Sequence, residues 1–100
     1  MDEIRRAFRA MGDNKRLQML ELLAEHEELT VSELAALVQV SQPLMSWHLM
    51  RFKRAGLVAT RRDGREVYCT LQRSRLIECQ EAIAKLLVKQ AAREQAGKLR

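Results

Sequence analysis

The sequence is poor in the residues that interrupt secondary structure and in those that crosslink small domains. Its 100 residues include one proline, four glycines, two cysteines and 4% aromatics. Two cysteines are too few for a disulfide framework, so apolar packing must hold the fold together. Hydrophobic residues make up 47% of the chain, which is ample for the core of one domain spanning residues 1–100.

Long apolar runs are also missing. No uninterrupted run approaches the ~18 residues of a membrane span, and residues 1–6 lack the apolar core of a signal peptide. We therefore expect a cytoplasmic protein without membrane contact. There is no Ser/His/Asp or Cys/His constellation, no paired carboxylate site and no glycine-rich phosphate loop, so we expect no enzyme and no cofactor.

Positive charge is concentrated in one part of the chain. The net charge is +5, yet residues 51–75 alone carry +6, and the rest of the chain sums to −1. Residues 21–33 hold five glutamates and no lysine or arginine. A basic segment on an otherwise balanced domain indicates a localised face for a polyanion, whereas ordinary solubility charge would be spread evenly.

Apolar periodicity and capping signals predict five helices, at about residues 3–11, 14–25, 31–39, 42–55 and 74–95. Each of the middle three should bury one stripe of side chains. The predicted core residues are Leu17, Leu20, and Leu23 or Ala24; Leu34, Leu37 and Val38; and Leu44, Met45, Leu49 and Phe52.

The third and fourth helices are separated by a short link, which is typical of a helix-turn-helix over residues 30–55. Thr30 and Glu33 have the spacing of a capping box before the third helix. Ser41 is a good N-cap for the fourth helix, and Pro43 fits its first turn.

Residues 57–71 predict a two-stranded wing behind the fourth helix. Gly56 can take a positive φ where that helix ends. Asp63-Gly64 is typical of a tight hairpin turn, and residues 66–71 alternate apolar and polar positions as a returning strand.

The fourth helix and the wing carry the residues expected to contact double-stranded DNA. Gln42 can pair with adenine, and Ser46 can bond a base or a phosphate. Trp47 either packs on DNA or folds back onto the domain, and His48 either donates to a phosphate or bonds within the motif. The predicted DNA-contacting residues are Ser41, Gln42, Pro43, Ser46, Trp47, His48, Arg51, Arg54, Arg61, Arg62 and Arg65.

The first and last helices carry more apolar surface than a core of this size absorbs. We expect them to form a homodimer interface, the alternative being that the last helix packs only within its own chain. The predicted interface residues are Ile4, Phe8, Met11, Ile83, Leu86 and Leu87.

Several short motifs occur in the order and spacing of a known family. They are Leu34-Ala35, Ser41-Gln42-Pro43, Ser46-Trp47-His48-Leu49, Ala55-Gly56-Leu57-Val58, Arg61-Arg62-Asp63-Gly64-Arg65 and Tyr68. Over about residues 5–90 the chain resembles the ArsR/SmtB family of bacterial winged-helix repressors, and fits MarR-like regulators less well. The resemblance implies a mainly α winged helix-turn-helix with a small β-hairpin. It also implies a cytoplasmic homodimer that binds an imperfect palindrome at a promoter, with repression relieved by a chemical signal.

The metal-binding motifs of many members of that family are missing. Thr30 and Ser32 stand where the family's thiolates would be, and a hydroxyl is a poor ligand for thiophilic metals. Residues 74–95 contain no His and no Asp, so the zinc-type site of the last helix is missing too. We therefore expect no metal site of either type, and the sequence indicates no particular effector.

Cys69 and Cys79 leave three interpretations open. They could be two packing residues, a redox pair with Cα atoms within about 7 Å, or part of a metalloid site shared across a dimer. Our leading hypothesis is a sequence-specific DNA-binding regulator that represses its own operon. The alternatives are a thiol-based redox or metalloid sensor of the same fold and a winged-helix protein interaction module.

Overall fold

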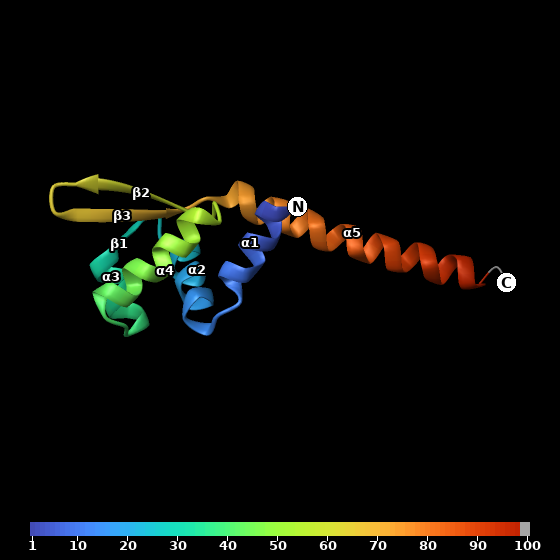
Figure 1. Cartoon of the computed structure of the whole chain (residues 1–100), viewed down its shortest axis with the longest axis horizontal. Helices are drawn as coiled ribbons and strands as arrows, with labels where there is room; N and C mark the ends of the chain where they lie inside the picture. Colours follow the sequence, from blue (N-terminus) through green and yellow to red (C-terminus); the bar gives the residue numbers. More distant parts are fainter. Residues whose placement is uncertain (99–100) are drawn as a thin grey trace.

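The computed structural model describes residues 1–98 as five helices and a small antiparallel sheet (Figure 1). The strand order is β1-β3-β2, so a short third strand extends the hairpin. The elements are α1 (Asp2–Met11), α2 (Asn14–Glu25), β1 (Leu29–Thr30), α3 (Val31–Val38), α4 (Gln42–Arg54), β2 (Val58–Asp63), β3 (Glu66–Leu71) and α5 (Arg73–Lys98). The predicted winged helix-turn-helix is confirmed.

Side-chain caps fix where the central helices begin. The Asp13 carboxylate accepts a bond from the Arg16 amide at the start of α2. Thr30 and Glu33 form both bonds of the predicted capping box at α3, and the Ser41 hydroxyl caps α4. Each cap satisfies amides that have no partner in the first helical turn. The helix starts predicted from Thr30 and Ser41 are confirmed.

The two helices of the motif end in the same way. After α4, Gly56 has φ 74°, and the Leu57 amide bonds the Phe52 carbonyl at 3.0 Å. This is the Schellman arrangement, in which a left-handed residue lets the chain turn sharply away from the helix. After α3, Gln39 takes the left-handed conformation with φ 62° although it is not glycine. The turn between α3 and α4 is therefore built on a residue with an unfavourable backbone conformation.

The hairpin turn lies one residue further along than predicted. Asp63 pairs with Glu66, so Gly64 and Arg65 are the two connecting residues. Gly64 has φ 62°, whereas Arg65 has no positive φ. A positive φ at the first central position alone is the signature of a type II′ turn. The prediction that Asp63-Gly64 forms the turn is wrong, because Asp63 still belongs to β2.

The core lies where α2, α3 and α4 meet the sheet. Three predicted core leucines, Leu17, Leu37 and Leu44, are instead exposed. Each lies next to the buried stripe of its helix, about 100° around the axis, so a short helix in this small domain cannot bury it as well. The largest fully buried side chains are Phe52, Met19, Leu34, Met45, Leu57, Val38 and Cys69.

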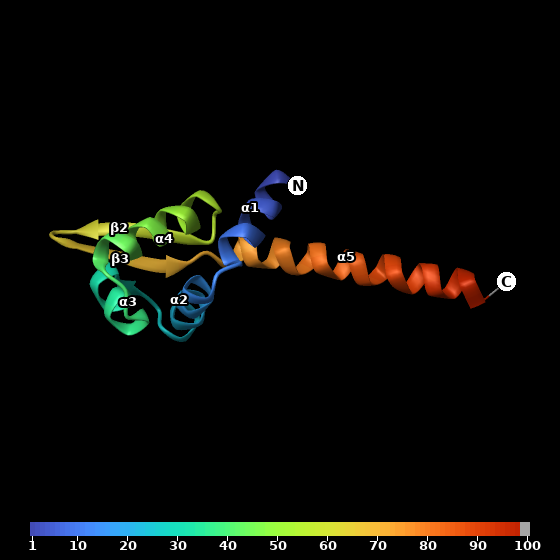
Figure 2. The same cartoon turned by 60° about the horizontal axis from the view of Figure 1, so that its bottom comes forward.

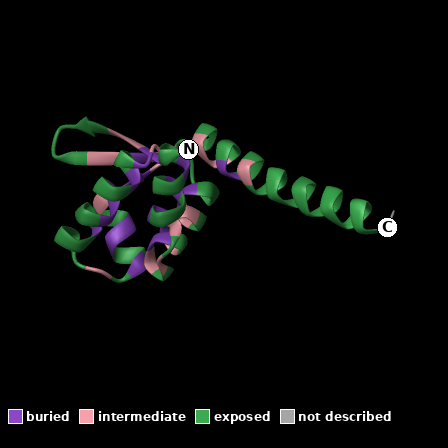
Figure 3. Cartoon of the chain, turned by 45° about the vertical axis from the view of Figure 1, so that its right-hand side comes forward, coloured by how far each residue is buried: buried purple, intermediate pink, exposed green. Residues whose placement is uncertain are grey.

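Helix α5 projects far beyond the rest of the molecule. Its 26 residues give a rod of about 39 Å, and the protein measures 65 × 23 × 22 Å. The radius of gyration is 17.2 Å, against about 13 Å for a compact chain of this length. Only Cys79 of α5 is buried, and Figure 3 shows the helix almost wholly exposed beyond its first turns. None of the described helices combines the length and apolarity needed to cross a membrane.

Candidate nucleic-acid interface

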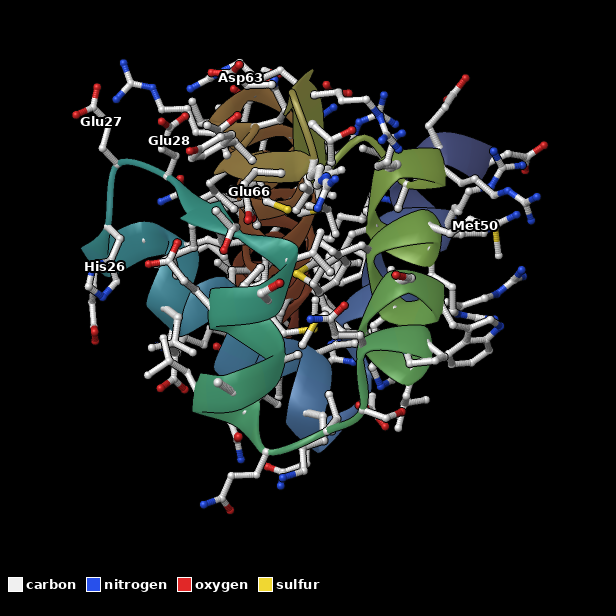
Figure 4. All side chains as sticks on the ribbon, turned by 90° about the vertical axis from the view of Figure 1, so that its left-hand side faces the viewer. His26, Glu27, Glu28, Met50, Asp63 and Glu66 are labelled. Carbon is white, nitrogen blue, oxygen red and sulfur yellow. The ribbon has the colours of Figure 1, made fainter. Side chains whose placement is uncertain are left out.

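Helix α4 has one face in the core and the other toward solvent. Met45, His48, Leu49 and Phe52 are buried, while Met50 points outward beside nitrogen-bearing side chains (Figure 4). Of the residues predicted to contact DNA from this segment, all except His48 lie on the exposed side. These are Ser41, Gln42, Pro43, Ser46, Trp47, Arg51 and Arg54. The exposed face therefore combines hydrogen-bonding groups near its start with arginines in its later turns.

Gln42 is held in place by the neighbouring helix. Its Nε2 donates to the Ser32 hydroxyl at 2.9 Å, which ties the first turn of α4 to the first turn of α3. An amide side chain has two N–H donors and a carbonyl acceptor, so one bond leaves groups for a second partner. The sequence identified Gln42, but its partner Ser32 could not be predicted from spacing alone.

His48 is bonded within the protein, which is one of the two roles predicted for it. The side chain is only 5% exposed, and its Nδ1 lies 3.2 Å from Nη1 of Arg16. Because a guanidinium can only donate, Nδ1 accepts and the ring proton resides on Nε2. Burial, and then the positive charge of Arg16, lowers the pKa of His48 below its usual range. His48 is thus a neutral acceptor beneath the exposed face.

Arg16 is a site residue that the sequence analysis missed. It is 8% exposed, and its Nε donates to the Ala10 carbonyl. It occupies the buried stripe of α2 with Met19 and Leu23, where an apolar residue is expected. A charged residue in phase with a buried stripe was the signal that could have revealed it.

Trp47 lies at the surface close to two guanidinium groups. The Arg51 Cζ lies 4.9 Å and the Arg16 Cζ 5.8 Å from the indole ring centroid. Both are within cation–π range. The ring meets His48 edge-on at 5.3 Å between centroids, yet Trp47 is 45% exposed. The indole is therefore held in a defined position while one side remains open to solvent.

The three predicted arginines of the wing differ in their surroundings. Arg61 donates from Nη2 to Glu28 Oε1 at 2.8 Å, and its Cζ lies 4.4 Å from the Tyr68 ring centroid. Arg62 and Arg65 are exposed, and neither takes part in an ion pair within residues 1–98. Arg61 is thus tied to the domain, whereas the other two guanidiniums are available to a ligand.

A cavity of about 400 Å³ is bordered by α3, α4 and the two strands of the wing. Its lining is mainly apolar with a basic rim, and it includes Val31, Ser46, Met50, Lys53, Thr60 and Val67. The exposed face of α4 and the wing therefore border the same hollow.

The two cysteines are free and buried. Burial raises the pKa of Cys69 to about 11 and also raises the pKa of Cys79. A raised pKa lowers the thiolate fraction, and the thiolate is the reactive and metal-binding form. Within residues 1–98, no three His, Cys, Asp or Glu side chains are grouped so that they could hold a metal ion.

Of the six residues predicted for the dimer interface, all except the exposed Leu87 line two grooves between α1 and α5. Ile4 and Leu86 line a groove of about 250 Å³, and Phe8, Met11 and Ile83 line another of about 350 Å³. Ile4 is nevertheless buried within its own protomer. The second groove is almost entirely apolar along its lining of Phe8, Met11, Leu76, Cys79, Gln80 and Ile83.

The matches to known proteins agree with this architecture. The family model for bacterial regulatory proteins of the arsR family matches residues 13–60, from the cap of α2 into β2. The structure of HlyU from Vibrio cholerae is 33% identical, with a TM-score of 0.70, and the match covers 85% of this chain and 91% of that one. The chain belongs to the ArsR family.

Two further ArsR-family relatives extend the match. The arsenic resistance transcriptional regulator ArsR1 of Pseudomonas putida is 39% identical over 64 residues, which are 64% of this chain and 50% of that protein. The chain thus spans about half the length of this curated relative. The homodimeric winged helix-turn-helix DNA-binding domain of Mb0332 from Mycobacterium bovis is 31% identical with a TM-score of 0.66, covering 94% of this chain and 82% of that one.

Proposed function

We propose that this protein is a sequence-specific transcriptional regulator that binds double-stranded DNA as a homodimer and represses the promoter it covers. The observation that carries the proposal is the exposed face of α4, where Gln42 and Ser46 precede Arg51 and Arg54. Base edges are read by hydrogen-bonding side chains, and the phosphate backbone is bound by cations. Membership of the ArsR family supports the same function.

In the proposed complex, α4 enters a major groove and the wing reaches the adjacent minor groove. Gln42, Ser46 and one edge of Trp47 supply specificity. Arg62 and Arg65, at the end of a narrow ribbon, suit the negative potential of a minor groove. The two half-sites of an imperfect palindrome should lie about one helical turn, ~34–36 Å, apart.

The proposed dimer forms through α1 and α5. Leu86 and Leu87 are 63% and 61% exposed, and the groove lined by Phe8, Met11 and Ile83 on the same two helices is almost entirely apolar. Two copies would cover this surface, and the related Mb0332 domain is described as homodimeric. A symmetric pair also matches the two-fold symmetry of a palindrome.

The dimer can be tested by placing charge on α5. Leu86→Glu combined with Leu87→Glu should give a monomer in sedimentation velocity at micromolar concentration, with far weaker binding to a palindrome. Leu17→Glu combined with Leu37→Glu is the matched control, because both are exposed leucines on helices outside the proposed interface. A wild-type monomer at that concentration would contradict the dimer.

The regulator is proposed to act in the cytoplasm without catalysis or a cofactor. Repression follows from occupying the promoter of its own operon, and the effector that relieves it is not assigned. Cys69 and Cys79 are given packing roles in this proposal because both thiols are buried with raised pKa values.

The function is tested by fluorescence anisotropy with a duplex from upstream of the protein's own gene and a random duplex of equal length. We expect the upstream duplex to bind at least ~10³-fold more tightly at near-physiological salt, with both affinities falling steeply as salt rises. Absence of binding to either duplex at ~50 mM salt would refute the proposal and favour a protein interaction module.

A further inference from the structure

A second basic site lies between α1 and α4, the proposed recognition helix. A cleft of about 210 Å³ is lined by Arg6, Arg9, Ala10, Arg51 and Arg54. Arg6 and Arg9 are three residues apart on α1, and Arg51 and Arg54 are three residues apart on α4. Residues at this spacing share one face of a helix, so two arginine pairs line one cleft.

No carboxylate balances these four charges in the described part of the chain. The cations in the ion pairs within residues 1–98 are the N-terminal amine, Arg5, Arg61 and Arg75, and none of them belongs to the cleft. Like charges around a small hollow repel one another, and an anion placed among them removes that repulsion. Guanidinium groups bind phosphate through paired N–H donors, so the cleft has the chemistry of a phosphate site.

We propose that the arginine cleft binds a backbone phosphate of the DNA on the side of α4 opposite the wing. This inference rests on the proposed function, because it assumes that α4 docks on a duplex. Figures 1 and 2 show the hairpin tip on one side of α4 and α1 on the other. Since α1 belongs to the proposed dimer interface, the phosphate in question lies toward the centre of the operator.

The position of the cleft favours a DNA phosphate over a free phosphorylated molecule. Arg51 and Arg54 extend from the helix that carries Gln42 and Ser46, so docking of that helix brings the backbone to the cleft. A volume of about 210 Å³ accommodates a phosphate group but is small for a nucleotide. A duplex also contacts Arg62 at the same time, which a free ion cannot do.

Removal of the α1 pair tests the site. Arg6→Gln with Arg9→Gln should flatten the plot of log affinity against log salt by about two units per dimer, because one phosphate contact is lost per protomer. The control is Arg5→Gln with Lys98→Gln, which removes the same charge. Arg5 pairs with Asp2 outside the cleft, and Lys98 ends α5. The control should keep a slope within about one unit of the wild-type value.

The location is tested with duplexes that carry one neutral methylphosphonate in place of a phosphate. Neutral linkages near the operator centre should weaken wild-type binding more than binding of the Arg6/Arg9 variant, which keeps only Arg51 and Arg54 in the cleft. Neutral linkages at the outer flanks should weaken both proteins equally. Equal losses at the central positions for both proteins would overturn the inference.

These experiments distinguish a failure of the arginine cleft from a failure of the proposed DNA-binding function. If wild-type protein binds no duplex, the proposed function fails; if it binds and the Arg6/Arg9 variant keeps the full salt slope, only the arginine cleft fails. A third experiment measures the unfolding temperature of both proteins with and without ~10 mM inorganic phosphate. An unfolding temperature raised by phosphate in wild type but not in the variant, with unchanged DNA slopes, would assign the cleft to free phosphate and overturn its assignment to DNA.

Discussion

The Nη1 of Arg16 lies 3.2 Å from the Nδ1 of His48, so a buried guanidinium is packed against a neutral imidazole and not against a carboxylate. This contact joins α2 to the underside of the recognition helix. Arg16 also lies beside the Trp47 ring, so the same group supports the exposed face. Protonation of His48 would place two cations in contact and would remove the acceptor.

The stability of the protein should therefore fall on mild acidification. Burial and the Arg16 charge lower the pKa of His48 in the folded state, while nearby Asp13 opposes the shift. The unfolded chain, with a His pKa of about 6.5, binds the proton more readily. Stability is complete above that value and is lost as the pH falls toward the folded-state pKa.

His48→Asn tests this linkage, since asparagine keeps an acceptor near the Nδ1 position and cannot be protonated. The unfolding temperature of this variant should drop less than that of wild type between about pH 7.5 and 5.5. His26→Asn, at an exposed position, is the control. If His48→Asn and wild type lose stability in parallel, the Arg16–His48 contact is not the cause.

The wing arginines should contribute unequally to DNA affinity. Arg62→Ala should weaken binding to specific and random duplexes alike and flatten the salt slope by about one unit per protomer. Arg61→Ala should have a smaller effect, because binding DNA through Arg61 requires giving up its bond to Glu28. Salt titrations of both variants provide the comparison, and a larger effect for Arg61 would contradict it.

Gln42 should determine preference at one base pair. Gln42→Ala is expected to cost about 1–3 kcal/mol on the preferred operator and little on duplexes altered at that pair. Ser32→Ala, which frees the Gln42 amide without removing it, should cause a smaller and partial loss of discrimination. Binding to a set of single-base operator variants measures both effects. Uniform losses across the set would show that Gln42 only positions the helix.

The thiols should be slow to react in the folded protein. With its pKa raised to about 11, Cys69 should react with a thiol reagent at neutral pH at least a hundredfold more slowly than a free cysteine of pKa ~8.5. Peroxide should leave DNA affinity unchanged in wild type and in a Cys69→Ser variant. A peroxide-dependent loss that both Cys69→Ser and Cys79→Ser abolish would support the redox alternative.

Local signals in the sequence predicted the helix starts well. Asp13, Thr30 and Ser41 cap their helices through contacts with residues three positions further on. Such caps can therefore be predicted from the spacing of residues in the sequence. The end of α4 at Gly56 follows from the same local chemistry. The positive φ of Gln39 has no such local signal, because glutamine, unlike glycine or asparagine, does not favour the left-handed conformation.

The spacing of residues along the sequence does not predict contacts between distant segments. Arg16 meets His48 across 32 residues, and Arg61 meets Glu28 across 33. The arginine cleft likewise combines residues of α1 and α4. Its α1 residues, Arg6 and Arg9, lie outside the basic segment 51–75. Leu17 and Leu37 were assigned to the core because periodicity identifies a helix but tolerates a rotation of about one residue in its buried face.

Because so much of α5 is exposed, the stability and the operator occupancy of this protein should depend on its concentration. If two protomers must meet to cover this helix, the midpoint of unfolding rises with total concentration by mass action. Operator occupancy then depends on the square of the free protomer concentration when dimers are scarce. A repressor of its own operon built in this way would switch over a narrower range of expression than a monomer with the same recognition helix.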